Sequence, residues 1–113
     1  MNQFNKTLVA DSDLAWTPVE DKIQRKIMSY NEDVMLVKVA FEKGGIGTMH
    51  KHPHLQISYI DGGVFEVTIG DDMRVLKDGD VYFVPSNVMH GVVCLEAGVL
   101  IDVFNPMRED FVK

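Results

Sequence analysis

The sequence consists largely of short apolar or alternating runs that end in turn-forming residues, at a spacing of about ten residues. The runs lie at 34–41, 57–60, 64–69, 73–76, 81–84, 88–95 and 99–104, and glycine, aspartate, asparagine or proline separates them. Short runs rich in β-branched and aromatic residues are typical of strands. Roughly seven or eight such strands predict an all-β sandwich or barrel.

Two local signals add detail to this expectation. Asp61-Gly62-Gly63 directly follows one run and predicts a hairpin turn. The segment from Pro18 to Lys26 is compatible with a helical turn, but no segment has the sustained 3.6-residue apolar period of a long amphipathic helix. With 113 residues and no linker or repeat, we expect one domain over 1–113, with its functional core at about 34–105.

The charge balance excludes some classes of partner. The chain has 11 basic and 17 acidic side chains and a formal charge of -6, so it lacks the basic surface that nucleic acids and anionic membranes attract. The first residues do not read as a signal peptide, and no run approaches the length of a membrane span. One cysteine, Cys94, permits no internal disulfide, and we expect it to pack as a small apolar residue. A cytoplasmic protein is the default expectation.

The histidines are the first sign of chemistry. Three of the four fall at 50, 52 and 54, and the fourth is His90. In a strand, His50, His52 and Gln56 would project to one face, because residues two apart share a face. Imidazole nitrogens and an amide oxygen suit one divalent ion such as Ni, Zn, Mn, Fe or Co. The alternative is that these are ordinary surface histidines, and we expect His54 to lie at the rim rather than act as a ligand.

The spacing around these residues resembles the two motifs of the cupin family. Gly44, His50, His52, Gln56 and Gly63 stand at the intervals of the first motif, which usually has glutamate where Gln56 stands. The second motif is matched by Gly79, Pro85 and His90, with Asn87 in place of its usual glycine and Cys94 in place of its usual asparagine. The resemblance implies a small double-stranded β-helix, or jelly-roll barrel, with metal ligands His50, His52, Gln56 and His90.

The amide at position 56 has an electrostatic consequence. Three neutral imidazoles and a neutral amide leave the full charge of a divalent ion uncompensated, whereas a glutamate would cancel one unit. The site should therefore attract an anionic ligand such as a carboxylate and polarise it.

Two charged residues near the C-terminus are further candidates. Asp102 interrupts the apolar run Val99–Phe104, and it lies either in the cavity or on the solvent face, because alternation alone does not say which face is inside. Inside, burial would raise its pKa and a metal would lower it, which suits proton transfer. Arg108 follows Pro106 and either folds over the cavity mouth to hold a carboxylate or belongs to a solvated tail.

Longer stretches resemble the KdgF family, small cupins of pectin and alginate degradation. The resemblance spans roughly residues 20–111 and rests on 35–39, 50–56, 85–91 and above all 95–111. It implies conversion of 4,5-unsaturated uronate monosaccharides to 5-keto-4-deoxyuronate, a non-redox, isomerase-type ring opening that depends on a metal. It also implies an acid/base role for Asp102 and substrate contacts for Phe104 and Arg108.

Two other functions remain open at this point. One is another metal-dependent cupin enzyme, such as a dioxygenase or a sugar isomerase, and the other is a non-catalytic sugar-binding cupin. The expected partner is a small anionic sugar, and because small cupins often pair their exposed edges we expect a homodimer. The ligand set suits several divalent metals, and no residue pattern distinguishes a pectin-derived from an alginate-derived substrate.

Overall fold

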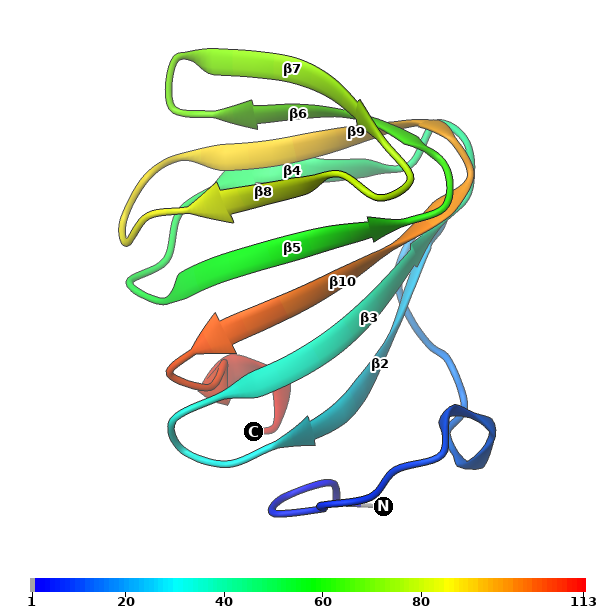
Figure 1. Ribbon diagram of the computed structural model, residues 1–113, viewed down its shortest axis with the longest axis vertical. Coiled ribbons are helices and arrows are strands. Elements are labelled where there is room, and N and C mark those ends of the chain that lie inside the picture. Colours follow the sequence, from blue (N-terminus) through cyan, green and yellow to red (C-terminus); the bar gives the residue numbers. More distant parts are fainter. Residues whose placement is uncertain (1) are drawn as a thin grey trace.

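The computed structural model describes residues 2–113, and it confirms the all-β prediction (Figure 1). The described chain forms ten strands and two short 3-10 helices, more strands than the seven or eight expected. The strands are β1 (Thr17–Glu20), β2 (Ile23–Tyr30), β3 (Met35–Phe41), β4 (Ile46–His50), β5 (Leu55–Asp61), β6 (Val64–Ile69), β7 (Asp72–Lys77), β8 (Val81–Val84), β9 (His90–Glu96) and β10 (Gly98–Asn105). The helices are η1 (Asp11–Asp13) and η2 (Glu109–Phe111). Neither has the length or apolar character that a membrane-spanning helix requires.

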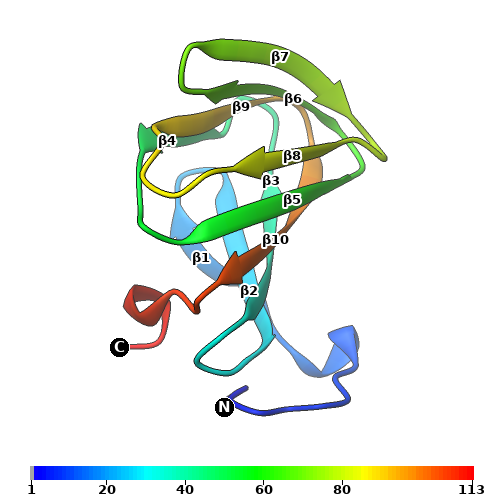
Figure 2. The same cartoon turned by 60° about the vertical axis from the view of Figure 1, so that its left-hand side comes forward.

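The strands form two antiparallel sheets that enclose one core. The larger sheet has the order β1-β2-β3-β10-β5-β8, and the smaller has the order β4-β9-β6-β7. Figure 2 shows the two sheets turned toward each other, with the C-terminal segment beside one open end. Their inner faces meet in a core that includes Ile60, Leu100 and Tyr82 of the larger sheet and Phe65 and Cys94 of the smaller. Cys94 is buried, as the sequence predicts.

Alternation along β10 decides which way its carboxylate points. Leu100, Asp102 and Phe104 are buried, and the residues between them are only partly buried. In a pleated strand, residues two apart share a face, so these three side chains all point into the space between the sheets. The structure therefore places Asp102 inside rather than on the solvent face.

Two local expectations are wrong. The segment from Pro18 to Lys26 is not a helical turn; it forms the hairpin of β1 and β2, which adds to the edge of β3. Asp61-Gly62-Gly63 does not close a hairpin, because β5 and β6 belong to different sheets. A Cβ at Gly63 would lie 2.6 Å from the carbonyl oxygen of Glu96, so glycine here permits a close backbone approach at the crossing between sheets.

Candidate metal centre and catalytic cavity

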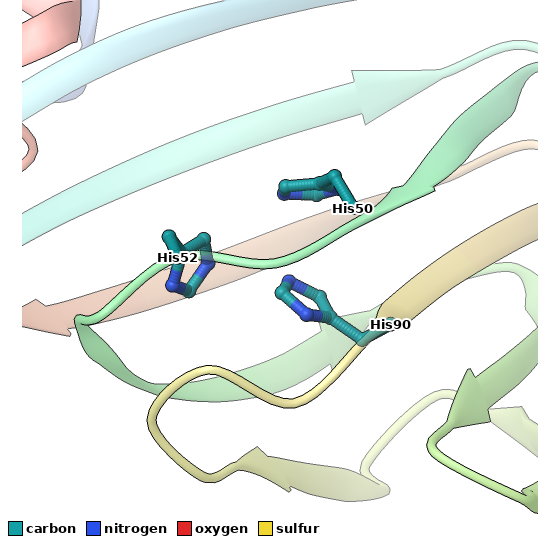
Figure 3. A group of neighbouring side chains, drawn as sticks. All are labelled: His50, His52 and His90. Carbon is teal, nitrogen blue, oxygen red and sulfur yellow. The ribbon is translucent and has the colours of Figure 1, made fainter.

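Three histidines from two segments of the chain lie close together (Figure 3). His50 ends β4 and His90 begins β9, and the two are register partners. His52 lies in the loop that follows β4, so the histidine run is not one continuous strand as the parity argument assumed. One ring nitrogen of each residue lies within 4.8 Å of those of the other two. The three side chains are therefore positioned to hold one metal ion.

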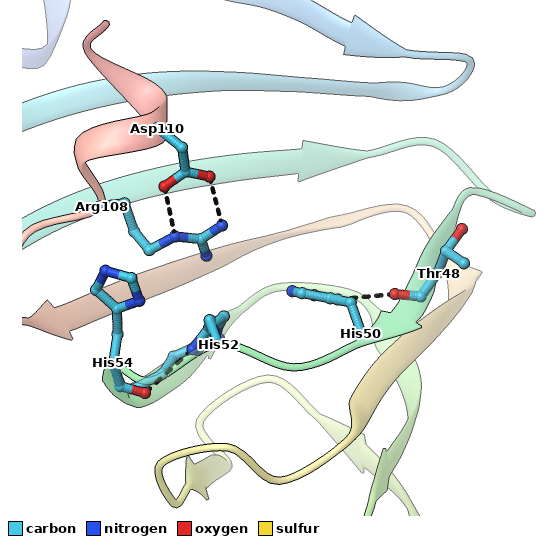
Figure 4. A network of polar contacts seen from close by, with 7 residues as sticks. Thr48, His50, His52, His54, Arg108 and Asp110 are labelled. Carbon is cyan, nitrogen blue, oxygen red and sulfur yellow. Dashed lines mark hydrogen bonds and ion pairs between the residues drawn. The ribbon is translucent and has the colours of Figure 1, made fainter.

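Backbone carbonyls fix the orientation of all three rings. In each case Nδ1 lies within hydrogen-bond distance of the carbonyl oxygen two residues away in the sequence, and Figure 4 shows two of these contacts. The distances are 2.8 Å for His50 to Thr48, 3.1 Å for His52 to His54 and 2.9 Å for His90 to Val88. Because a carbonyl only accepts, each Nδ1 must carry the proton, which leaves the Nε2 lone pair free for a metal.

The polar atoms around these rings fit a divalent cation. Within residues 2–113, the buried Nε2 of His90 has no hydrogen-bond partner. The Nε2 of His52 faces Oε1 of Gln56 at 3.1 Å, which brings two acceptors together when the histidine is neutral. Burial lowers the pKa of His52 and lowers that of His90 to about 4, so the neutral forms prevail at pH 7. A cation placed among these atoms would satisfy all of them, with Gln56 as an oxygen ligand.

The loop that carries His52 is tied to the turn that precedes His90. The backbone N–H of Asn87 donates to the carbonyl of His52 at 2.8 Å, and the Ser86 hydroxyl donates to the carbonyl of Pro53 at 2.5 Å. Asn87 has a φ of 62°, a left-handed conformation that asparagine tolerates better than most residues. This conformation explains why asparagine can stand where the cupin motif usually has glycine, and the tie holds two candidate ligands, His52 and His90, in register.

Asp102 lies in the same cavity and is held by a serine. The Ser58 hydroxyl donates to Oδ1 of Asp102 at 2.6 Å, and the two residues are cross-strand partners on β5 and β10. Burial raises the pKa of Asp102 to about 6, although the Ser58 hydrogen bond and the charge of Arg108 act in the opposite direction. A carboxyl group with this pKa can both accept and release a proton near neutral pH.

The C-terminal segment folds back over the cavity, so Arg108 lies at the cavity mouth and not in a solvated tail. The Arg108 guanidinium lies 5.1 Å from the ring centre of Phe104 and 4.3 Å from that of Phe111. Its Nε and Nη2 donate to the two carboxylate oxygens of Asp110 at 3.0 and 2.9 Å (Figure 4). This fork-to-fork pair fixes the plane of the guanidinium.

Arg25 adds a second guanidinium to the same edge of the cavity. It lies on β2 and stacks 3.9 Å from the ring centre of Phe111, on which Arg108 also stacks. In the described part of the chain Arg25 forms no ion pair with a carboxylate. The proximity of Arg108 and burial lower the pKa of Arg25, with burial the larger cause. The mouth therefore has two guanidinium groups, of which Arg108 is paired with Asp110 and Arg25, among the residues described, is not in an ion pair.

A cavity of about 200 Å³ joins these groups. Its walls include His50, His90, Gln56, Asp102, Phe104 and Arg108. A larger depression of about 740 Å³ lies between the N-terminal segment and β2, but none of the four metal-ligand candidates lines it. The smaller cavity is the candidate reaction site, because three of the four candidate metal ligands and the buried carboxylate line it.

The chain is similar in sequence to known cupin proteins. The sequence model of the Cupin domain family matches residues 37–104. The chain is 52% identical over 103 residues to the pectin degradation protein KdgF of Dickeya dadantii (strain 3937), a match that covers 89% of this chain and 94% of that protein. The chain belongs to the cupin family and, within it, to the KdgF proteins.

Solved structures lead to the same family. KdgF from Halomonas sp. has a TM-score of 0.90 and 40% identity, with 93% of this chain and 99% of that chain covered. An RmlC-like cupin from Shewanella frigidimarina NCIMB 400 has a TM-score of 0.93 and 37% identity, with 97% and 99% covered. The KdgF architecture thus extends over nearly the whole of this chain.

The structure also brings forward residues that sequence reasoning missed. Ser58 is fully buried beside Asp102, and its position two residues after Gln56 on β5 was a signal that the two side chains share a face. Phe111 reaches the cavity mouth through tertiary folding alone, and no motif marks it. Arg25, which the sequence offers only as a weaker candidate than Arg108 for holding a carboxylate, stacks on the same ring. His54 contacts the rings of His52 and Phe104, with centroid distances of 5.3 and 6.5 Å, and lies outside the three-histidine group.

Proposed function

We propose that this KdgF protein is a metal-dependent, non-redox enzyme that opens the ring of 4,5-unsaturated uronate monosaccharides to give 5-keto-4-deoxyuronate. The observation that carries the proposal is a buried carboxylate, Asp102, with a pKa of about 6, which lines the same cavity as His50 and His90 of the three-histidine group. The name of the Dickeya relative, a pectin degradation protein, supports a substrate derived from pectin. Alginate lyases would release related sugars that share the reacting atoms.

The reaction needs proton transfer and charge stabilisation but no electron transfer. The substrate is a cyclic hemiacetal whose ring oxygen joins C1 to the enolic carbon C5. Loss of the C1 hydroxyl proton and cleavage of the bond from C1 to the ring oxygen leave an aldehyde at C1 and an enolate at C5. Return of one proton at C4 then converts the enolate to a ketone. Atoms and electrons balance without a co-reactant, so an isomerase-type activity suffices.

The ligand set proposed for the metal is His50, His52, Gln56 and His90. A bound divalent ion such as Ni, Zn, Mn, Fe or Co would supply Lewis-acid chemistry and positive charge at the substrate carboxylate and the adjacent oxygen. All four protein ligands are neutral, so they leave that charge uncompensated and favour an anionic substrate.

The other side chains of the cavity have separate tasks in this proposal. Asp102 moves a proton, between the C1 hydroxyl and C4, because its raised pKa lets it exchange protons near pH 7. Phe104 is buried below the guanidinium of Arg108, where it walls the sugar and excludes water. Arg108 holds the anionic substrate through the donor edge that faces away from Asp110, with the charge of Arg25 in support.

The test is an assay on freshly generated 4,5-unsaturated galacturonate, following the loss of its ultraviolet absorbance with and without a chelator. We expect catalysed loss that a chelator abolishes and a divalent metal restores, and an Asp102→Ala variant that binds metal but does not catalyse the loss. A rate no faster than spontaneous ring opening in metal-loaded protein would refute the enzyme proposal.

We also propose a homodimer formed through the outer face of the larger sheet. Ile57, Tyr59, Val81 and Phe83 are 45–51% exposed there, and they form the cross-strand pairs Ile57 with Phe83 and Tyr59 with Val81. A contiguous apolar patch of this kind is typical of an interaction surface. Light scattering of the purified protein should give twice the monomer mass, and an Ile57→Lys/Phe83→Lys variant should give the monomer mass.

A further inference from the structure

Ser58 is neither a proposed metal ligand nor a proposed proton carrier, but its hydroxyl bonds to two residues that line the cavity, Gln56 and Asp102. Its side chain is completely buried in the middle of β5. Across the sheet it is the register partner of Asp102 on β10 and of Tyr82 on β8. A fully buried hydroxyl in a largely apolar core requires partners, and it therefore indicates a specific polar role.

The partners of Ser58 form a directional chain. Nε2 of Gln56 donates to the Ser58 hydroxyl at 3.0 Å, and that hydroxyl donates to Oδ1 of Asp102 at 2.6 Å. A serine hydroxyl can donate only one hydrogen bond, and here it donates that bond to the carboxylate of Asp102. The Gln56 amide must then turn its NH₂ toward Ser58, which directs its oxygen toward His52 at 3.1 Å.

We propose that Ser58 is a positioning residue that orients the amide of Gln56 toward the metal and the carboxylate of Asp102 toward the substrate at the same time. This inference rests on the proposed function, since it assigns Asp102 and Gln56 the parts given above. It also accounts for the amide at position 56, where the cupin motif usually has glutamate. A carboxylate there cannot donate to Ser58, so two acceptors would compete for one hydroxyl proton and Asp102 would lose its donor.

The first test removes the hydroxyl and measures the metal directly. Ser58→Ala and wild-type protein are loaded with Co²⁺, and affinity is measured by chelator competition alongside the visible spectrum of the bound ion. We expect the affinity of Ser58→Ala to fall about 10- to 100-fold, with a changed spectrum, because the amide is no longer held. Ser29→Ala is the matched control, since it deletes a serine hydroxyl that bonds to the Lys6 carbonyl outside the cavity, and it should behave as wild type.

The second test uses turnover and the opposite chemical change. Gln56→Glu should bind Co²⁺ at least as tightly as wild type, yet its kcat should fall at least about tenfold, because the chain to Asp102 is broken. Adding Ser58→Ala to Gln56→Glu should lower kcat little further, since the two residues act through one chain. Ser58→Thr, which keeps the hydroxyl, should retain both affinity and kcat.

The outcomes separate this inference from the proposed function. Wild-type Co²⁺ affinity and spectrum in Ser58→Ala would overturn the positioning role, whatever the substrate proves to be. Full kcat in Gln56→Glu would overturn the explanation for the amide. If the wild type has no uronate activity, the Co²⁺ measurements still decide the role of Ser58. If Ser58→Ala does not fold, retained Co²⁺ affinity in Ser58→Thr supports the role, and affinity lost in a folded Ser58→Thr overturns it.

Discussion

Replacing Asp102 with asparagine should stabilise the metal-free protein at alkaline pH while it removes activity. The pKa of Asp102 rises from 3.8 to about 6 on folding, and at 1.36 kcal/mol per pH unit this corresponds to about 3 kcal/mol. The folded state thus binds the proton more tightly than the unfolded state does. The resulting stabilisation is fully present below pH 3.8 and is lost as the pH rises through about 6.

The magnitude follows from the same two pKa values. Asparagine is neutral at every pH and can still accept the hydrogen bond from Ser58, so it resembles the protonated side chain. The difference in unfolding free energy between Asp102→Asn and wild type should become more favourable to the variant by about 2 kcal/mol between pH 4.5 and pH 8. Activity should fall at least about 100-fold, the range of general acid–base catalysis.

Urea unfolding in the presence of a chelator, at both pH values, measures the first effect. Asp61→Asn is the control, because Asp61 is exposed at the end of β5 and its side chain forms no hydrogen bond within residues 2–113. Its effect should stay within about 0.5 kcal/mol at both pH values. A difference between Asp102→Asn and wild type that does not change with pH would refute the buried, ionisable carboxylate. Wild-type turnover in that variant would refute its catalytic role.

Three further predictions concern the rest of the cavity. His90→Ala should abolish the stabilisation by divalent metal, which in the wild type reaches about 2.7 kcal/mol at a metal concentration 100 times Kd, as thermal melts can show. Phe104→Leu should cost about 1 kcal/mol in urea unfolding and lower kcat/KM, since the ring that lies between His52 and Arg108 is lost; unchanged kinetics would argue against a wall role. Arg108→Lys should raise KM more than it lowers kcat. It should change the unfolding free energy by less than about 1 kcal/mol, because the side chain of its partner Asp110 is 60% exposed; a large loss of stability would show a structural role instead.

Much of the fold could be read from local patterns. Strands β6 and β8 have the boundaries that their apolar runs predict, and five others, β3, β5, β7, β9 and β10, differ by one or two residues at one or both ends. No apolar run predicted β1, β2 or β4. The prediction failed at Pro18–Lys26 because the strand character of β2 comes from pairing with β3, a tertiary contact that no local pattern reveals. It failed at Asp61-Gly62-Gly63 because the residues that form a tight turn can equally well carry the chain from one sheet to the other.

The sequence alone determined the identities and the spacing of the groups that can bind a metal. His50, His52, Gln56 and His90 stand out because imidazole and amide groups at motif intervals are rare by chance, and this information is one-dimensional. Strand alternation was an incomplete reason for bringing His50 and His52 together, because His52 belongs to a loop. A hydrogen bond from Asn87 to the carbonyl of His52 ties this loop in place. The residue types and their spacing were thus sufficient to predict a metal site, although they did not predict its geometry.

Only the tertiary structure decided which way Asp102 points and what surrounds it. Strand alternation is symmetric between the two faces, so burial could be assigned only once the smaller sheet covered one face of β10. The raised pKa of Asp102, its hydrogen bond from Ser58 and the stacking of Arg25 and Arg108 on Phe111 all depend on segments far apart in the chain. The pKa of a group depends on what surrounds it in three dimensions. The types of the candidate ligands therefore came from the sequence, and only the fold determined the raised pKa of Asp102.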